Sequence, residues 1–209
     1  PVRKEDKNTL DSYAIASRLS YFLWSSMPDA ELLKLAQTDQ LKDPNVRLAQ
    51  SERMLRDPKS NRFVKDFLTS WLALGSLGET QPDRRTFAPY YNDDLESAMK
   101  QETYLFARHL LDENRSIDQF INSTFTFVNR GLADLYNLDV PLDGSGFQKV
   151  AVVGKPRGGL LGQASVLTAT ANGVDTSPIV RGVWMLENLL GTPTPPPPPD
   201  IEPLDPDIR

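Results

Sequence analysis

The sequence predicts a mainly α-helical protein: an orthogonal bundle of about eight or nine helices, with at most a small β hairpin and a C-terminal polyproline II tail. Apolar residues recur at helical spacing along most of the 209 residues. Aspartate, serine or asparagine precedes most of these segments, often with proline next, as is usual where helices begin. The run Pro195–Pro199 ends the pattern, because proline lacks an N–H and fixes φ.

Four helices are expected in the first third of the chain, over about 10–25, 29–36, 44–56 and 61–75. Asn8 or Thr9 is the predicted cap of the first helix, whose apolar residues point all around its axis. Such a helix is expected in the middle of a bundle. Asp29 caps the second helix, and Asp43, followed by proline, opens the third.

The longest helix is expected over about 93–113, after a loop over 75–92. Asp93 and Glu96 have the spacing of a capping box at its start. Shorter helices follow over about 116–122, 131–136, 160–169 and 178–191. The segments 125–128 and 147–153 alternate like strands and are able to pair with each other.

Composition divides the chain into three predicted parts. The Gly- and Pro-containing junction at 141–146 separates a larger helical domain, residues 1–140, from a smaller one, residues 141–192, that packs on it. Residues 193–209 form the proline-rich linker or tail.

Charge and composition exclude several classes of protein. There are 23 basic and 28 acidic residues, a net charge of −5 and no Lys/Arg-rich run, which argues against a nucleic-acid partner. No apolar run approaches the roughly 18–20 residues of a membrane span. The chain has no cysteine, which rules out disulfides, thiolate metal sites and covalent CxxCH haem attachment within it. No cofactor is therefore expected in this chain.

Glu102 and His109 are the candidate catalytic residues, because both fall within the apolar stripe of the long helix, two turns apart. They form either a general acid/base pair or, as we prefer, part of a structural arrangement in which Glu102 neutralises Arg18 or another buried arginine such as Arg53. No third ligand stands at a recognisable spacing, so no metal site is predicted.

Two other segments contain candidate anion contacts. The glycines after Arg157 lack the spacing of a phosphate loop, so close packing of the backbone is the preferred interpretation. Ser177, at the start of the last helix, and Arg181, one turn later, are able to hold a carboxylate or phosphate. A capped helix with a solvated or paired arginine is the plainer alternative.

Several strings resemble known families: RLSYFLWSSMPDAELL at 18–33, FLTSWL at 67–72 and FTFVNRGLADLY at 125–136. They are similar to a planctomycete cytochrome-associated domain of unknown function. GLLGQASVLTATAN at 159–172 and TSPIVRGVWMLENLLGTPTPPPPP at 176–199 resemble the second domain that habitually follows it. The resemblance covers almost the whole chain.

The resemblance implies a context rather than an activity. Such domains usually occur in large secreted proteins, after a signal peptide and a c-type cytochrome-like domain, and the proline tract leads to a segment with a CxxCH-like sequence. It implies c-type haem in adjoining segments and an extracytoplasmic location (periplasmic or secreted). That Arg157 or Arg181 contacts a haem propionate is our own hypothesis.

The leading interpretation is a non-catalytic helical scaffold module of a larger secreted c-type cytochrome-like protein, which supports or docks a haem domain in extracytoplasmic electron transfer. Its partners are other domains of the same polypeptide. The alternatives are an enzyme acting on a polysaccharide-derived substrate, with Glu102 and His109 as its residues, and a binding module for a companion secreted protein. An exposed aromatic patch would favour the binding module.

Overall fold

The computed structural model describes residues 10–195 with the exception of residues 80, 93, 145, 155, 156 and 194. Three predictions therefore lie wholly or largely outside the described residues: the caps Asn8 and Thr9, the capping box that includes Asp93, and the polyproline tail 193–209.

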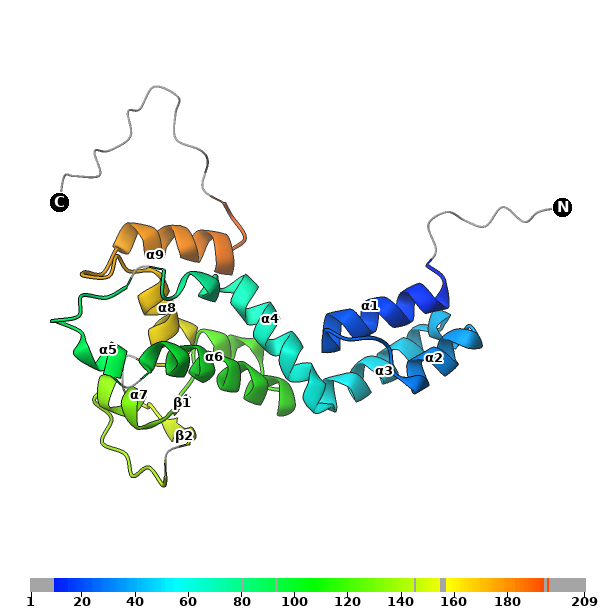
Figure 1. Ribbon diagram of the computed structural model, residues 1–209, viewed down its shortest axis with the longest axis horizontal. Helices are drawn as coiled ribbons and strands as arrows, with labels where there is room; N and C mark the ends of the chain where they lie inside the picture. Colours follow the sequence, from blue (N-terminus) through cyan, green and yellow to red (C-terminus); the bar gives the residue numbers. More distant parts are fainter. Residues whose placement is uncertain are drawn as a thin grey trace.

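The described chain is elongated and consists of two regions (Figure 1). The N-terminal region, residues 11–60, holds α1 (Ser12–Trp24), α2 (Ala30–Gln37) and α3 (Pro44–Arg56). Helix α4 (Asn61–Trp71) leads from this region into the body, which we define as residues 61–191.

Each helix of the N-terminal region begins at an aspartate whose carboxylate accepts a backbone N–H. Asp29 accepts from Leu32 at 2.9 Å, and Asp43 accepts from Asn45 at 2.8 Å, as predicted. Asp11 does the same for α1. These bonds satisfy N–H groups that a helix leaves free at its first turn, so the local sequence sets where each helix starts.

Helix α1 lies at the edge of its region, which corrects the prediction that it lies in the middle of a bundle. Tyr13, Tyr21 and Phe22 are 53%, 57% and 63% exposed. The buried residues follow one stripe, on which Trp24 donates its Nε1–H to the carbonyl of Met54 at 2.9 Å. The core of the N-terminal region consists of Ala16, Leu23, Trp24, Leu32, Ala36, Leu41 and Met54.

A row of aromatic rings connects the two regions along α4. Ring centroids are 5.0 Å apart for Phe22 and Phe63, 5.6 Å for Phe63 and Phe67, and 5.5 Å for Phe67 and Trp71. Three of these residues are four apart in sequence and therefore share one helix face. Because Phe63 packs against the core of each region, the row joins them mechanically.

The body contains the remaining helices. They are α5 (Ala88–Asn92), α6 (Leu95–Asp112), α7 (Arg130–Leu135), α8 (Ala164–Ala169) and α9 (Pro178–Trp184), which continues as a π-helix over Met185–Leu189. Helix α5 forms within the predicted loop 75–92, and the segment predicted as a helix after Ser116 is a 3₁₀ turn, Ile117–Phe120. Gly191, with φ +62°, follows the end of the last helix.

The two strands predicted to pair do so. Strand β1 (Phe125–Val128) runs antiparallel to β2 (Gln148–Ala151), with Thr126 opposite Val150. Phe125 and Phe127 alternate with Thr126 along β1, so Thr126 is turned to the opposite, buried face. Strand β1 packs on α6.

Segments on both sides of the 141–146 junction share one core in the body. Trp184 donates Nε1–H to the carbonyl of Leu72 at 3.0 Å, and Trp71 donates to the carbonyl of Asn188 at 2.6 Å. Leu160, which follows the junction, belongs to the same apolar cluster as these tryptophans. The division into domains at 140 and 192 stays a prediction.

The mainly α fold is confirmed: the described residues form nine α-helices and one two-stranded antiparallel sheet. None of the helices in the described part of the chain has both the length and the hydropathy needed to cross a membrane.

Candidate functional site: a closed polar centre and an open cavity

Glu102 lies at the centre of the body, on α6, and its side chain is 0% exposed. One carboxyl oxygen accepts the hydroxyl of Thr126 at 2.5 Å, and the other accepts the hydroxyl of Tyr136 at 2.5 Å. The Tyr136 oxygen in turn accepts the backbone N–H of Ala164 at 2.7 Å. This network, the Glu102 network, links α6, β1, the end of α7 and the start of α8.

Burial raises the pKa of Glu102 to about 7, because the charged form loses its hydration. The hydroxyls of Thr126 and Tyr136 and the positive charge of Arg157 oppose this rise. Such a pKa would suit a general acid or base. However, the carboxyl group is sealed from solvent and both of its oxygens are occupied, so no external substrate reaches it in this conformation.

The structure corrects the predicted ion pair of Arg18 with Glu102. Arg18 is exposed on α1, and hydroxyl groups rather than a guanidinium satisfy the carboxyl group. Arg53, the alternative, pairs instead with Asp29 at 2.8 Å inside the N-terminal region. Arg18 and Glu102 belong to different regions of the molecule: α1 is part of the N-terminal region, whereas Glu102 lies in the core of the body.

His109 does not work with Glu102, although both are on α6. Its ring packs against Phe125 and Phe127, and its Nε2 lies 2.8 Å from Nζ of Lys149. Partial burial and, next, the charge of Lys149 lower the pKa of His109. The neutral ring accepts a hydrogen bond from the ammonium group of Lys149, and this contact joins β2 to α6. Glu102 and His109 thus have separate partners and form no catalytic pair.

Among the described residues, no group of three or more histidine, aspartate or glutamate side chains is arranged to hold a metal ion.

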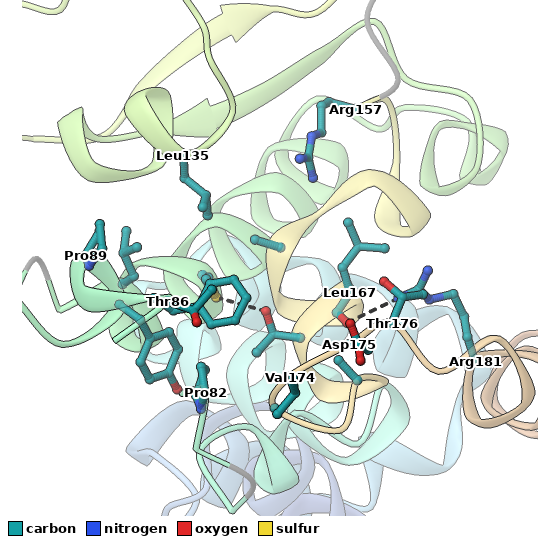
Figure 2. A pocket seen from close by; sticks show the side chains of 18 residues that line it. Pro82, Thr86, Pro89, Leu135, Arg157, Leu167, Val174, Asp175, Thr176 and Arg181 are labelled. Atoms are coloured by element: carbon teal, nitrogen blue, oxygen red, sulfur yellow. Dashed lines mark hydrogen bonds between the residues drawn. The ribbon is translucent and has the colours of Figure 1, made fainter. Parts of the chain in front are cut away.

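An open cavity of about 460 Å³ lies beside the Glu102 network, in the size range of small-molecule sites (Figure 2). Its walls come from the 82–90 segment, α6, the end of α7, the segment at Arg157, α8, the turn before α9 and α9 itself. Most of the wall is apolar, with Phe87, Tyr90, Leu95, Met99, Leu135, Ala164, Leu167, Ala171 and Val174. The charged residues that line it are Arg157, Asp175 and Arg181.

The structure brings Arg157 and Arg181 to this one cavity, although they are 24 positions apart in sequence (181 − 157). They enter it from separate segments (Figure 2). Within the described residues, neither guanidinium has a carboxylate within 4.0 Å. Ser177, the third candidate anion contact, does not line the cavity and makes no side-chain cap bond to α9.

Each arginine is held in place by neutral groups. Arg157 lies over the ring of Tyr136, 4.5 Å from its centroid, and donates weakly to the carbonyl of Gly162 at 3.3 Å. Arg181 donates Nε–H to the hydroxyl of Thr170 at 3.1 Å. A guanidinium has five N–H donors, so both retain donors for a ligand.

The glycines after Arg157 allow close backbone packing, in agreement with the preferred interpretation. A Cβ on Gly158 would lie 2.2 Å from the carbonyl oxygen of Ser123. Gly159 has φ +68°, and a Cβ there would lie 2.5 Å from the carbonyl oxygen of Ile121 and 2.6 Å from that of Phe120. These glycines bring the segment that carries Arg157 against the chain before β1.

Sequence reasoning missed Thr126 and Tyr136. The alternation of β1 gave a signal for Thr126, because a hydroxyl on the inward face of a strand needs a partner. Tyr136 ends α7 and gave no comparable signal. Nothing in its local sequence indicates a contact with Glu102, 34 residues earlier.

Family models match two parts of the chain. Residues 10–138 match PSD4, a protein family of unknown function (DUF1592), and residues 157–209 match PSCyt3, also of unknown function (DUF1588). No curated protein and no solved structure matches the chain. The order of the two matches confirms the predicted resemblance. The PSCyt3 match covers the last 53 residues (209 − 157 + 1), after the PSD4 match. The chain belongs to the PSD4 family, a planctomycete cytochrome-associated domain of unknown function.

Proposed function

We propose that this chain is a non-catalytic helical scaffold module of a larger secreted c-type cytochrome-like protein, and that it docks a haem domain during extracytoplasmic electron transfer. One observation carries the proposal: the open cavity has apolar walls and two guanidinium groups, and the acid/base candidate Glu102 does not line it. Such a cavity suits recognition of an apolar, anionic surface rather than acid/base chemistry.

The residues of this chain do not fit covalent attachment of a c-type haem, because the chain has no cysteine. They fit a contact with haem made by another segment. A haem presents an apolar ring edge and two propionate carboxylates, and Arg157 and Arg181 provide donors for carboxylates. The haem itself would supply the electron transfer, and the chain would supply the docking site.

The rest of the body is built to hold this cavity in shape. The Glu102 network connects α6 to α8, and the two tryptophan bonds tie α4 to the last helix. Helices fixed by buried hydrogen bonds hold their side chains in one geometry. This is the requirement for a scaffold that holds a redox group at a set distance.

Visible absorption spectra and redox titrations test the proposal. The full-length natural protein, purified after secretion, is compared with the 209-residue chain. We expect c-type haem bands in the full-length protein and none in the chain. Absence of haem from the full-length protein would contradict the proposed role in electron transfer.

A variant tests the docking contact. In the full-length protein, Arg181→Ala should shift the midpoint potential of the haem. The reason is that a positive charge beside a propionate affects the energies of the oxidised and the reduced haem unequally. The matched control is Arg56→Ala, an exposed arginine of the N-terminal region. Unchanged haem spectra and potential in Arg181→Ala would contradict docking at this cavity.

A further inference from the structure

We propose that the cavity is a binding site for a flat apolar molecule that carries two carboxylates, one for Arg157 and one for Arg181. This inference makes the proposed docking function more specific. It depends on that function only where it names haem propionates as a source of the carboxylates. The same chemistry is presented by the propionates of a haem held elsewhere in the protein and by a free aromatic dicarboxylate.

The apolar body of the ligand is inferred from the cavity walls. Phe87, Tyr90, Leu167 and Val174 all line the cavity. Phe87 is 40% exposed and Val174 is 60% exposed, so both keep apolar surface that a ligand would cover. Burial of such surface stabilises a complex, against the costs of association.

The carboxylates are inferred from the two guanidinium groups. Both arginines are half-buried, and no described carboxylate lies within 4.0 Å of either. Asp175 lines the same cavity, so the three charged side chains of the wall sum to +1. A cation that is partly removed from water and has no carboxylate within 4.0 Å favours an anionic ligand.

The number of carboxylates is inferred from the separation of the arginines in the fold. Arg157 comes from the segment before α8, whereas Arg181 belongs to α9 (Figure 2). Arg157 lies over the ring of Tyr136, and Arg181 is bonded to Thr170. Because neutral contacts anchor each guanidinium in its own place, one carboxylate is inferred for each arginine.

Binding of matched probes to the 209-residue chain tests the inference. The probes are naphthalene-2,6-dicarboxylate, the monoacid 2-naphthoate and the neutral dimethyl ester of the diacid, with affinities measured by calorimetry at low salt. We expect the diacid to bind about tenfold or more tightly than the monoacid, and the diester most weakly. Equal affinity of the diacid and the diester would overturn carboxylate recognition.

Variants assign the carboxylates. Arg157→Gln and Arg181→Gln should each weaken diacid binding by about tenfold or more and leave the affinity for the diester unchanged. Arg84→Gln is the matched control: Arg84 stacks on Tyr91 near the cavity and does not line it. A loss confined to one of the two variants would overturn the two-carboxylate form.

Thermal unfolding checks that each variant is folded. If Arg157→Gln does not fold, Arg157→Lys replaces it, because lysine keeps the charge and loses the planar fork of donors. Lysine should then retain monoacid binding and keep only part of the advantage of the diacid, because its charge remains and the paired donors are lost. Retention of the full advantage would contradict a role for the guanidinium.

A further arm identifies the source of the carboxylates. The probe is a c-type haem peptide, a haem attached to a short CxxCH segment, compared with the same peptide after esterification of its propionates. Binding that needs free propionates and both arginines supports docking of haem. If the diacid binds and the haem peptide does not, the site stands and the proposed haem docking fails; if neither binds, the site itself is overturned.

Discussion

The N-terminal region and the body differ in how far their side-chain hydrogen bonds reach along the chain: the bond of Trp24 to Met54 in the N-terminal region spans 30 residues, and bonds in the body reach further. In the N-terminal region, aspartates cap the helices within a few residues in sequence. In the body, the key polar contacts span long stretches of chain: Glu102 to Tyr136 spans 34 residues, and Trp71 to Asn188 spans 117. Local caps define helices, whereas long-range bonds define how helices meet. The cavity lies in the body, where long-range bonds bring distant segments together.

Replacement of Trp24 should give the largest effect and should separate the two regions. Trp24→Ala removes a side chain that is 1% exposed and its bond to Met54. Loss of a buried tryptophan costs about 3–5 kcal/mol of unfolding free energy. Hydrogen exchange should speed up in residues 12–56 and much less in the body.

The control is Tyr13→Ala on the same helix, which is 53% exposed and should change stability by about 0.5 kcal/mol or less. Equal acceleration of exchange in both regions of Trp24→Ala would show that they unfold as one unit.

Glu102 should make the stability of the body depend on pH. Its pKa rises in the folded protein to about 7 from 4.5, so the folded state holds the proton more strongly. The folded state is therefore favoured most below pH 4.5, and this advantage is lost as the pH rises through 7. The total is about 3 kcal/mol.

The measurement is the difference in unfolding free energy between the natural protein and Glu102→Gln, across pH 4–8. The amide does not titrate, so subtraction removes the contributions of other carboxylates. The difference should move in favour of the variant as the pH rises. A difference independent of pH would show that Glu102 keeps an ordinary pKa.

Tyr136→Phe should destabilise the body by about 2 kcal/mol, because it leaves the N–H of Ala164 and one oxygen of Glu102 without a buried partner. Urea unfolding at constant pH measures the change. Tyr21→Phe, on an exposed tyrosine, is the control. Equal stability of both variants would mean that water replaces the lost hydroxyl.

Asp43→Ala should give the smallest effect, about 1 kcal/mol, through loss of the cap on the N–H of Asn45. Asp43→Ser, which keeps a capping oxygen, should restore most of this loss. Thermal unfolding compares the two variants. If serine is no better than alanine, the contribution of Asp43 is not that of a cap.

Much of the fold was predictable because its signals are local. Helix periodicity predicted α2, α3 and α6 closely, and Asp29 and Asp43 were identified as caps. The pairing of β1 with β2 followed from two alternating segments. Helix α5 was missed because a proline-containing segment next to a loop gives little periodic signal.

The candidate site was less predictable because it depends on which distant segments meet. Glu102 was correctly placed on an inward face, but its partner was assigned to Arg18 by charge alone. A carboxyl group in a core can be satisfied by any donor within reach, and hydroxyl groups at Thr126 and Tyr136 were closer in the fold.

The sequence by itself determined the helical class, most of the helix boundaries, the family and the residue types available for binding. Only the tertiary structure decided that Glu102 is sealed and that Arg157 and Arg181 line one cavity. The physical reason is range. Propensity, capping and periodicity act over a few residues, whereas burial and the meeting of charges depend on contacts between segments that are dozens of residues apart.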